Sequence, residues 1–162
     1  MKPRVKPLPP AEWDDFQQAN PQNVFTTLGR HPAVYEGWLR FGGALLNGTL
    51  PARDRELAIL RTAFHSGSAY EWVHHARIAR EVGLTDVEIE SVRQLDALWP
   101  VEDRLVLQVA DDLHYAGDLT DATWAALCDR YDEVRRIELV VLVAHYAMLA
   151  LVLRTFGVQL EE

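Results

Sequence analysis

Cysteine is almost absent from this chain, because Cys128 is the only one among 162 residues. A single thiol forms no internal disulfide, and it matches none of the cysteine spacings that bind zinc. The scarcity is typical of a reducing compartment, so we expect a cytoplasmic protein. Cys128 follows Leu127 on the apolar side of an expected helix, which predicts a buried and inert thiol.

Basic charge and long apolar runs are also scarce. The 24 acidic residues outnumber the 16 Lys and Arg, for a net charge of −8, and no basic stripe offsets this excess. Nucleic acids are therefore not expected partners. The opening segment MKPRVKPLPP has no apolar core of the kind found in signal peptides. The longest apolar run, Leu139–Leu153, falls short of the roughly 18 residues of a spanning helix, so no membrane association is expected.

Strand-type alternation, internal repeats and low-complexity segments are missing as well, and every strong hydrophobic period is helical. The sequence therefore predicts an all-α protein. Four prolines in residues 1–10 indicate an extended arm, so we divide the chain into an arm with a short helix, 1–20, and a helical domain, 21–162. Caps and stop residues place the expected helices at 11–19, 23–29, 32–46, 51–65, 68–82, 86–95, 100–115, 121–131 and 132–156.

The last expected helix is apolar nearly all round between Leu139 and Leu153. Such a helix has to be surrounded by protein, and a chain of this length has few other helices to cover it. We therefore expect a subunit interface and a homo-oligomer.

The segment Glu56–Val82 carries most of the candidate chemistry. Two helical patterns meet there at a break around Gly67, which predicts an antiparallel pair. With a rise of about 1.5 Å per residue, Glu56 can approach His75 across that pair. Glu71 lies four residues before His75, on the same face, and a carboxylate beside an imidazole is a proton-transfer pair in outline.

Each of these residues also has a structural interpretation. A Glu/His pair four apart is common on solvated faces, and Glu56 could instead bind Arg53 or Arg61. Ser68-x-x-Glu71 fits a helix capping box, although a hydroxyl at a helix start can also face a substrate.

Two further histidines are candidate substrate contacts. His65 lies in the break and could reach the groove, while His145 falls within the apolar last helix, where a buried histidine needs a partner. The sequence lacks a His-Glu-x-x-His or Glu-x-x-His repeat. A metal site built from Glu56, Glu71, His75 and a further histidine is thus left without a specific motif, and no metal and no cofactor are expected.

The frame formed by Glu56, Ser68, Glu71 and His75 resembles a known motif, Glu-x11-Cys-x2-Cys-x3-His. It belongs to the peroxidase branch of the carboxymuconolactone decarboxylase family, which includes alkyl hydroperoxidase D. The Glu and His match in register, and both cysteines are replaced. Short segments around this frame, such as Arg-Glu-Leu at 55–57, Tyr-Glu-Trp at 70–72 and residues 145–158, resemble a cysteine-less branch of this family.

The resemblance implies an AhpD-like helical bundle that assembles as a homotrimer or homohexamer, with its site near a subunit interface. It also implies a small-molecule substrate. Peroxidase chemistry in that branch needs an attacking and a resolving thiol, and Ser68 and Glu71 stand in those places.

Three functions follow as hypotheses. The first is a cofactor-free lyase or isomerase acting on a small organic acid or lactone. In it His75 is the acid or base, Glu71 orients it or accepts its proton, and Glu56 tunes the pair; a further set contacts the substrate, namely His65, Ser68 and His145. The second is a peroxiredoxin-type antioxidant using Cys128. The third is a non-catalytic oligomer that binds a small ligand or a partner protein.

Overall fold

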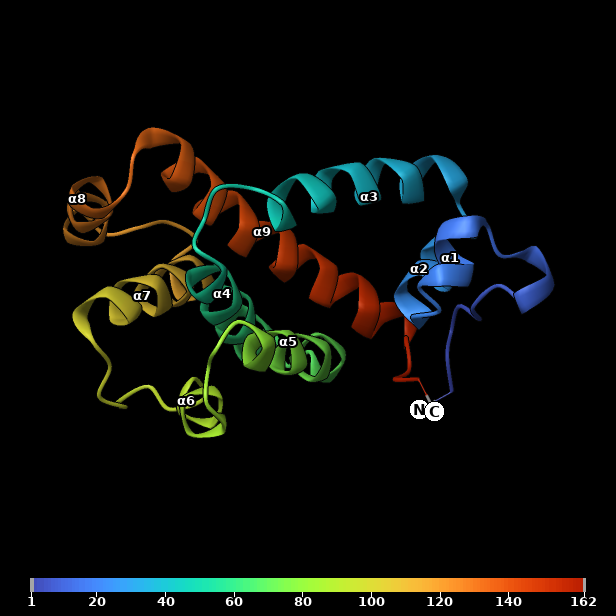
Figure 1. The fold of residues 1–162 in the computed structure, drawn as a ribbon, viewed down its shortest axis with the longest axis horizontal. Helices are drawn as coiled ribbons and strands as arrows, with labels where there is room; N and C mark the ends of the chain where they lie inside the picture. The colour runs from blue at the N-terminus through green and yellow to red at the C-terminus, as the bar shows by residue number, and fades with distance from the viewer. Residues whose placement is uncertain (1, 162) are drawn as a thin grey trace. The chain divides into compact units, whose positions relative to one another are not determined.

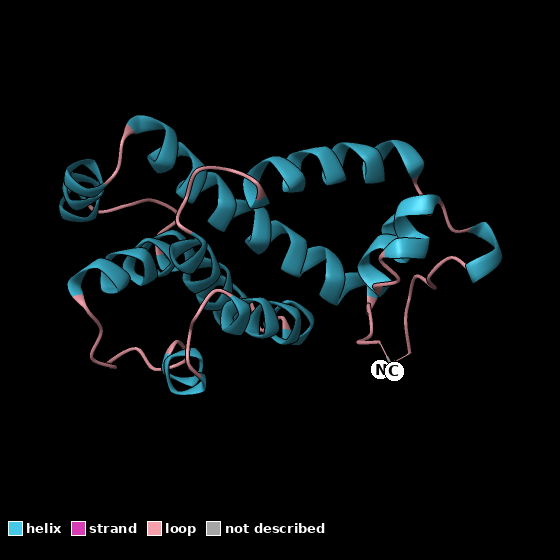
Figure 2. Cartoon of the chain, viewed as in Figure 1, coloured by secondary structure: helices cyan, strands magenta, loops and turns pink. Residues whose placement is uncertain are grey.

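The computed structural model describes residues 2–161, and within this range helices joined by loops form the whole fold, with no strand (Figures 1 and 2). This confirms the all-α prediction. The elements are, in order, a 3-10 turn η1 (Pro10–Glu12), α1 (Asp15–Ala19), α2 (Asn23–Leu28), α3 (Pro32–Leu46), α4 (Ala52–His65), α5 (Ala69–Glu81), α6 (Asp86–Ser91), α7 (Val101–Tyr115), α8 (Asp121–Arg130) and α9 (Glu133–Phe156).

The helices begin and end at the residues that cap them. Thr85 opens α6 with the predicted capping box, in which its hydroxyl accepts from the Glu88 amide and the Glu88 carboxylate accepts from the Thr85 amide. Gly67 and Gly83 follow α4 and α5 at φ values of 61° and 96°, a left-handed backbone that favours glycine. Two expected helices are shorter by four residues in the structure, while the others agree to within two residues. The first begins only at Asp15, and α6 ends at Ser91 instead of near Leu95.

The chain forms two compact units. One comprises residues 2–47 and 151–161, and the other comprises residues 48–150. In the first unit, the amides of Arg4 and Val5 both donate to the Phe156 carbonyl. In the second unit, α4 packs against both α5 and α7. The domain boundary expected at residue 20 stays a prediction.

α9 is the longest helix, and it is long and apolar enough to cross a membrane by length and composition alone. Less than half of its most apolar window is buried in the structure. The core helix of a soluble protein meets the same two criteria. The feature is thus weak evidence for a membrane span.

Candidate functional site

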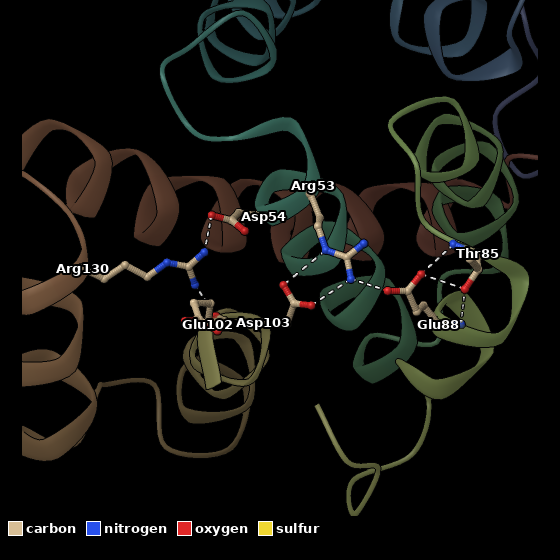
Figure 3. A network of polar contacts seen from close by, with 7 residues as sticks. All are labelled: Arg53, Asp54, Thr85, Glu88, Glu102, Asp103 and Arg130. Atoms are coloured by element: carbon tan, nitrogen blue, oxygen red, sulfur yellow. Dashed lines mark hydrogen bonds and ion pairs between the residues drawn. The ribbon is translucent and has the colours of Figure 1, made fainter. Parts of the chain in front are cut away.

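Four consecutive charged side chains at the start of α4, Arg53 to Glu56, all form ion pairs. Arg53 binds Asp103 of α7, with Nη2 2.8 Å from Oδ2, and also contacts Glu88 of α6. Asp54 binds Arg130 at 2.7 Å (Figure 3). These ion pairs hold the first turn of α4 against three neighbouring helices, and this positions the residues that follow directly, Arg55 and Glu56.

Glu56 and His75 meet across the α4–α5 pair, as the sequence predicted. The Nδ1 atom of His75 lies 2.7 Å from Oε2 of Glu56. Glu56 is fully buried and His75 is 8% exposed, so the pair is largely shielded from water. The alternative partners of Glu56 are engaged elsewhere, because Arg53 binds Asp103 and Arg61 binds Asp111.

Glu56 is held by a second donor on its other oxygen. The Nε atom of Arg55 lies 3.0 Å from Oε1, so both oxygens of the carboxylate accept hydrogen bonds. This arrangement fixes the orientation of the His75 ring and directs Nδ1 to Glu56, which leaves Nε2 as the nitrogen that can serve a substrate. The hydrogen-bond partner of His75 is therefore Glu56, whereas Glu71 was the partner expected from the sequence.

Tyr146 of α9 is part of the same cluster, although it was not among the residues predicted from the sequence. Its ring packs edge-on against His75 with 4.9 Å between ring centroids, and the side chain is buried. Burial raises the pKa of the Tyr146 hydroxyl, and the charges of Glu56 and Glu71 raise it further. The signal available in the sequence was a tyrosine within an apolar run, since a buried phenol usually has a polar neighbour.

Glu71 is a buried carboxyl group without a partner. It is 3% exposed, and neither of its carboxylate oxygens has a hydrogen-bond partner among the described residues. Burial raises its pKa to about 8. The Ser68 hydroxyl opposes this rise, but no bond of proper geometry forms, so the loss of hydration dominates. Glu71 thus carries its proton at neutral pH and can act as a donor.

Only half of the predicted capping box at the start of α5 forms. The Ser68 side chain accepts from the Glu71 amide at 3.4 Å, whereas the Glu71 carboxyl makes no return bond. Capping alone therefore does not explain why an acid stands at position 71.

The raised pKa of Glu71 predicts a distinct pH dependence of stability. A carboxyl group protonated in the folded state, but ionised in the unfolded chain, stabilises the fold fully below its ordinary pKa of 4.5. That stability is lost as the pH rises to about 8. We expect the unfolding free energy of the wild type to fall relative to that of Glu71→Gln by up to several kcal/mol across this window.

Urea unfolding of both proteins at several pH values between 4.5 and 8.5 measures the difference. Parallel stability curves for the two proteins would contradict a protonated Glu71.

Comparison with known proteins identifies the family of this chain. Residues 32–112 match the Carboxymuconolactone decarboxylase family. The chain belongs to the carboxymuconolactone decarboxylase family. This match contains α4, α5 and most of α7, and with them Glu56, Glu71 and His75; Tyr146 lies beyond it. No curated protein sequence is significantly similar to the chain.

Solved structures share the fold of this decarboxylase-family chain. An alkylhydroperoxidase AhpD core protein described as peroxidase-related, from Ralstonia eutropha JMP134, is 21% identical, with a TM-score of 0.79 over 91% of this chain and 82% of that one. A peroxidase-related protein from Silicibacter sp. TM1040 is 15% identical, with a TM-score of 0.81 over 98% and 89%. The debrominase Bmp8, solved with 2,3,4-tribromopyrrole, is 16% identical, with a TM-score of 0.78 over 99% and 93%.

The two histidines expected to contact substrate lie in different surroundings. His145 is 4% exposed and packs edge-on against Tyr146 with 5.4 Å between ring centroids, and burial lowers its pKa. His65 instead binds Asp111 of α7 at 2.6 Å and stacks on His114. The structure thus shows His65 in a second cluster with α7, where the sequence analysis had expected it to face the Glu56–His75 groove.

Cys128 does not lie where the sequence predicted. It is exposed, and Nη1 of Arg136 lies 2.6 Å from its sulfur. The prediction of a buried thiol was wrong, because the buried positions of α8 are Thr123 and Leu127 and Cys128 projects beside them. Within residues 2–161, no group of three His, Cys, Asp or Glu side chains is arranged to hold a metal ion.

Proposed function

We propose that this member of the carboxymuconolactone decarboxylase family is a cofactor-free lyase or isomerase that moves protons on a small organic acid or lactone. The observation that carries the proposal is the buried contact of 2.7 Å between His75 and Glu56, beside a carboxyl group that keeps its proton at neutral pH. A base and an acid with separated protonation states, side by side in a desolvated site, are what proton transfer requires.

In the proposed reaction, Nε2 of His75 removes a proton from carbon next to a carbonyl group, and Glu56 stabilises the imidazolium that forms. The electron pair moves onto the carbonyl oxygen. The protonated groups of Glu71 and Tyr146 can donate hydrogen bonds to that oxygen. A proton returned to a different carbon completes an isomerisation. In a decarboxylation, loss of CO₂ generates the same type of anion, which His75 or Glu71 protonates.

The experiment that tests this function follows exchange with solvent. Purified protein is incubated in D₂O with a panel of unsaturated lactones and carboxylic acids, and NMR records deuterium at carbon. We expect catalysed incorporation into at least one compound class that carries a carbonyl group next to the exchanging carbon. Absence of exchange in all of them would support the alternative of a non-catalytic ligand-binding oligomer. The near-complete burial of Glu56 and Glu71 is the observation that favours this alternative.

A thiol peroxidase function has less support, although two structural neighbours are described as peroxidase-related. That chemistry needs a thiol that attacks and a second one that resolves, and this sequence contains one cysteine. The positions of the pair hold Ser68 and Glu71. Cys128 lies exposed on α8, where its sulfur accepts from Arg136.

Assembly as a homotrimer or homohexamer, in the cytoplasm, is part of the proposal. It is supported by large apolar side chains exposed along α9: Val134, Ile137, Met148 and Leu151. We expect light scattering at micromolar concentration to give three or six times the 18.4 kDa mass of the chain. A monomeric mass would contradict an interface on α9.

A further inference from the structure

A pocket of about 350 Å³ opens where α4 turns into α5. It is lined by side chains that are mostly apolar or aromatic, and Arg93 is the one ionisable group among them: Ala63, Phe64, Gly67, Ser68, Ala69, Trp72, Val73 and Arg93. Its volume is at the lower end of the roughly 300–1,000 Å³ found for small-molecule sites. The pocket is therefore sized for a small ligand.

Arg93 lies flat against one aromatic wall of this pocket. Its guanidinium carbon is 3.9 Å from the centroid of the Trp72 ring, a cation–π contact that orients the planar group. Its other partner is Glu90, whose carboxylate oxygen lies 3.3 Å from Nε of Arg93. The Arg93 side chain is 44% exposed and the Glu90 side chain is 66% exposed. An ion pair this exposed contributes little stability, so the carboxylate of a ligand can replace Glu90.

The pocket adjoins the proton-transfer site through α5. Ser68 lines the pocket and is 2% exposed. Glu71 and His75 lie three and seven residues further along, so the three side chains share one face of the helix. Ser68 therefore connects the pocket to Glu71, while Glu71 and His75 themselves lie behind the pocket lining.

Resting on the proton-transfer function proposed above, we propose that this pocket binds the substrate, and that the substrate is a small planar monocarboxylate. Arg93 binds its carboxylate, and Phe64 and Trp72 contact its unsaturated body. The proposal follows from charge complementarity, since the pocket lining carries one positive and no negative side chain within a chain of net charge −8. The positive end of the α5 helix dipole, at Ala69, also favours a negatively charged group of the ligand.

Benzoate and its neutral analogue benzamide are suitable probes, with binding to the full chain measured by calorimetry and by quenching of tryptophan fluorescence. We expect saturable binding of benzoate that Arg93→Gln weakens about tenfold or more, while the weaker binding of benzamide stays the same. Arg77→Gln is the matched control, because Arg77 is an exposed arginine of α5 that binds Glu81 outside the pocket. It should leave the affinity for both probes unchanged.

Equal benzoate affinity in Arg93→Gln and wild type would overturn the proposal, and so would the absence of saturable benzoate binding to the wild type. Thermal unfolding confirms that each variant is folded. His75→Gln separates this proposal from the proposed function, since it should retain benzoate binding while losing turnover. If His75→Gln keeps full turnover and Arg93→Gln still loses benzoate, the pocket assignment stands and the proton-transfer mechanism fails.

Discussion

Replacing His75 by Gln is expected to lower the turnover of the proton-transfer reaction by about 100-fold or more, the range over which a positioned acid or base contributes. Glutamine approximates the size of imidazole and can still hydrogen-bond to Glu56, but it neither takes up nor releases a proton near neutral pH. The fold should survive, because the buried carboxylate of Glu56 keeps a donor. Deuterium incorporation at carbon, measured with the accepted substrate, gives the rate.

Glu56→Gln tests the orienting partner in the same assay. It keeps a hydrogen-bond acceptor for His75 but removes the negative charge that stabilises the imidazolium, so we expect a loss of about 10- to 100-fold in kcat with little change in KM. Cys128→Ser is the matched control and should leave turnover unchanged. Undiminished turnover in His75→Gln would refute the mechanism, and a Cys128→Ser protein without activity would point to thiol chemistry instead.

Among the substitutions considered, Asp111→Ala should cause the largest loss of unfolding free energy. Arg61 is 2% exposed, and it donates from Nε and Nη2 to the two carboxylate oxygens of Asp111 at 2.6 and 2.9 Å. Its Nη1 atom donates to the carbonyl groups of Val92 and Gln94. Asp111→Ala leaves this guanidinium buried without its counter-charge, which costs about 3 kcal/mol or more of unfolding free energy. Urea unfolding at pH 7 measures it.

The double variant Arg61→Met, Asp111→Leu provides the internal control. It removes both charges and fills their space with apolar groups, so it should recover most of the stability lost in Asp111→Ala. Asp129→Ala, at an exposed position of α8, should change stability by less than about 0.5 kcal/mol. A loss below about 1 kcal/mol in Asp111→Ala would show that the buried pair contributes little.

Most of the helices could be predicted because their signals are local. The stop at Gly67 and the capping box at Thr85 each depend on residues within four positions in the chain. The C-terminal end of α6 was not predicted correctly. Its apolar period continues toward Leu95, but the structure ends the helix at Ser91, and Val92 and Gln94 give their carbonyl groups to Arg61 of α4. A carbonyl bound by a distant arginine leaves no trace in the local sequence.

The candidate site was predicted in part. The contact between Glu56 and His75 was predicted correctly. The helical rise is constant, so counting residues from the turn at Gly67 shows that the two positions lie at the same level of the antiparallel pair. The hydrogen bond to His75 comes from Glu56 and not from Glu71, the acid that is closer in sequence, and the catalytic roles of the two acids stay predictions. His65 was placed in the groove from its position in the break, whereas its ring binds Asp111, 46 residues further along.

The amino-acid order was enough to establish an all-helical chain, the turn at Gly67 and a carboxylate beside an imidazole, since hydrophobic period, capping and helical rise act over one or two turns. The packing of α4, α5 and α9 decided which acid hydrogen-bonds to His75, brought Tyr146 to it and, among residues 2–161, left the Glu71 carboxyl without a hydrogen-bond partner. Those outcomes depend on side-chain directions and on the exclusion of water between helices. Both arise only when segments distant in the chain come into contact.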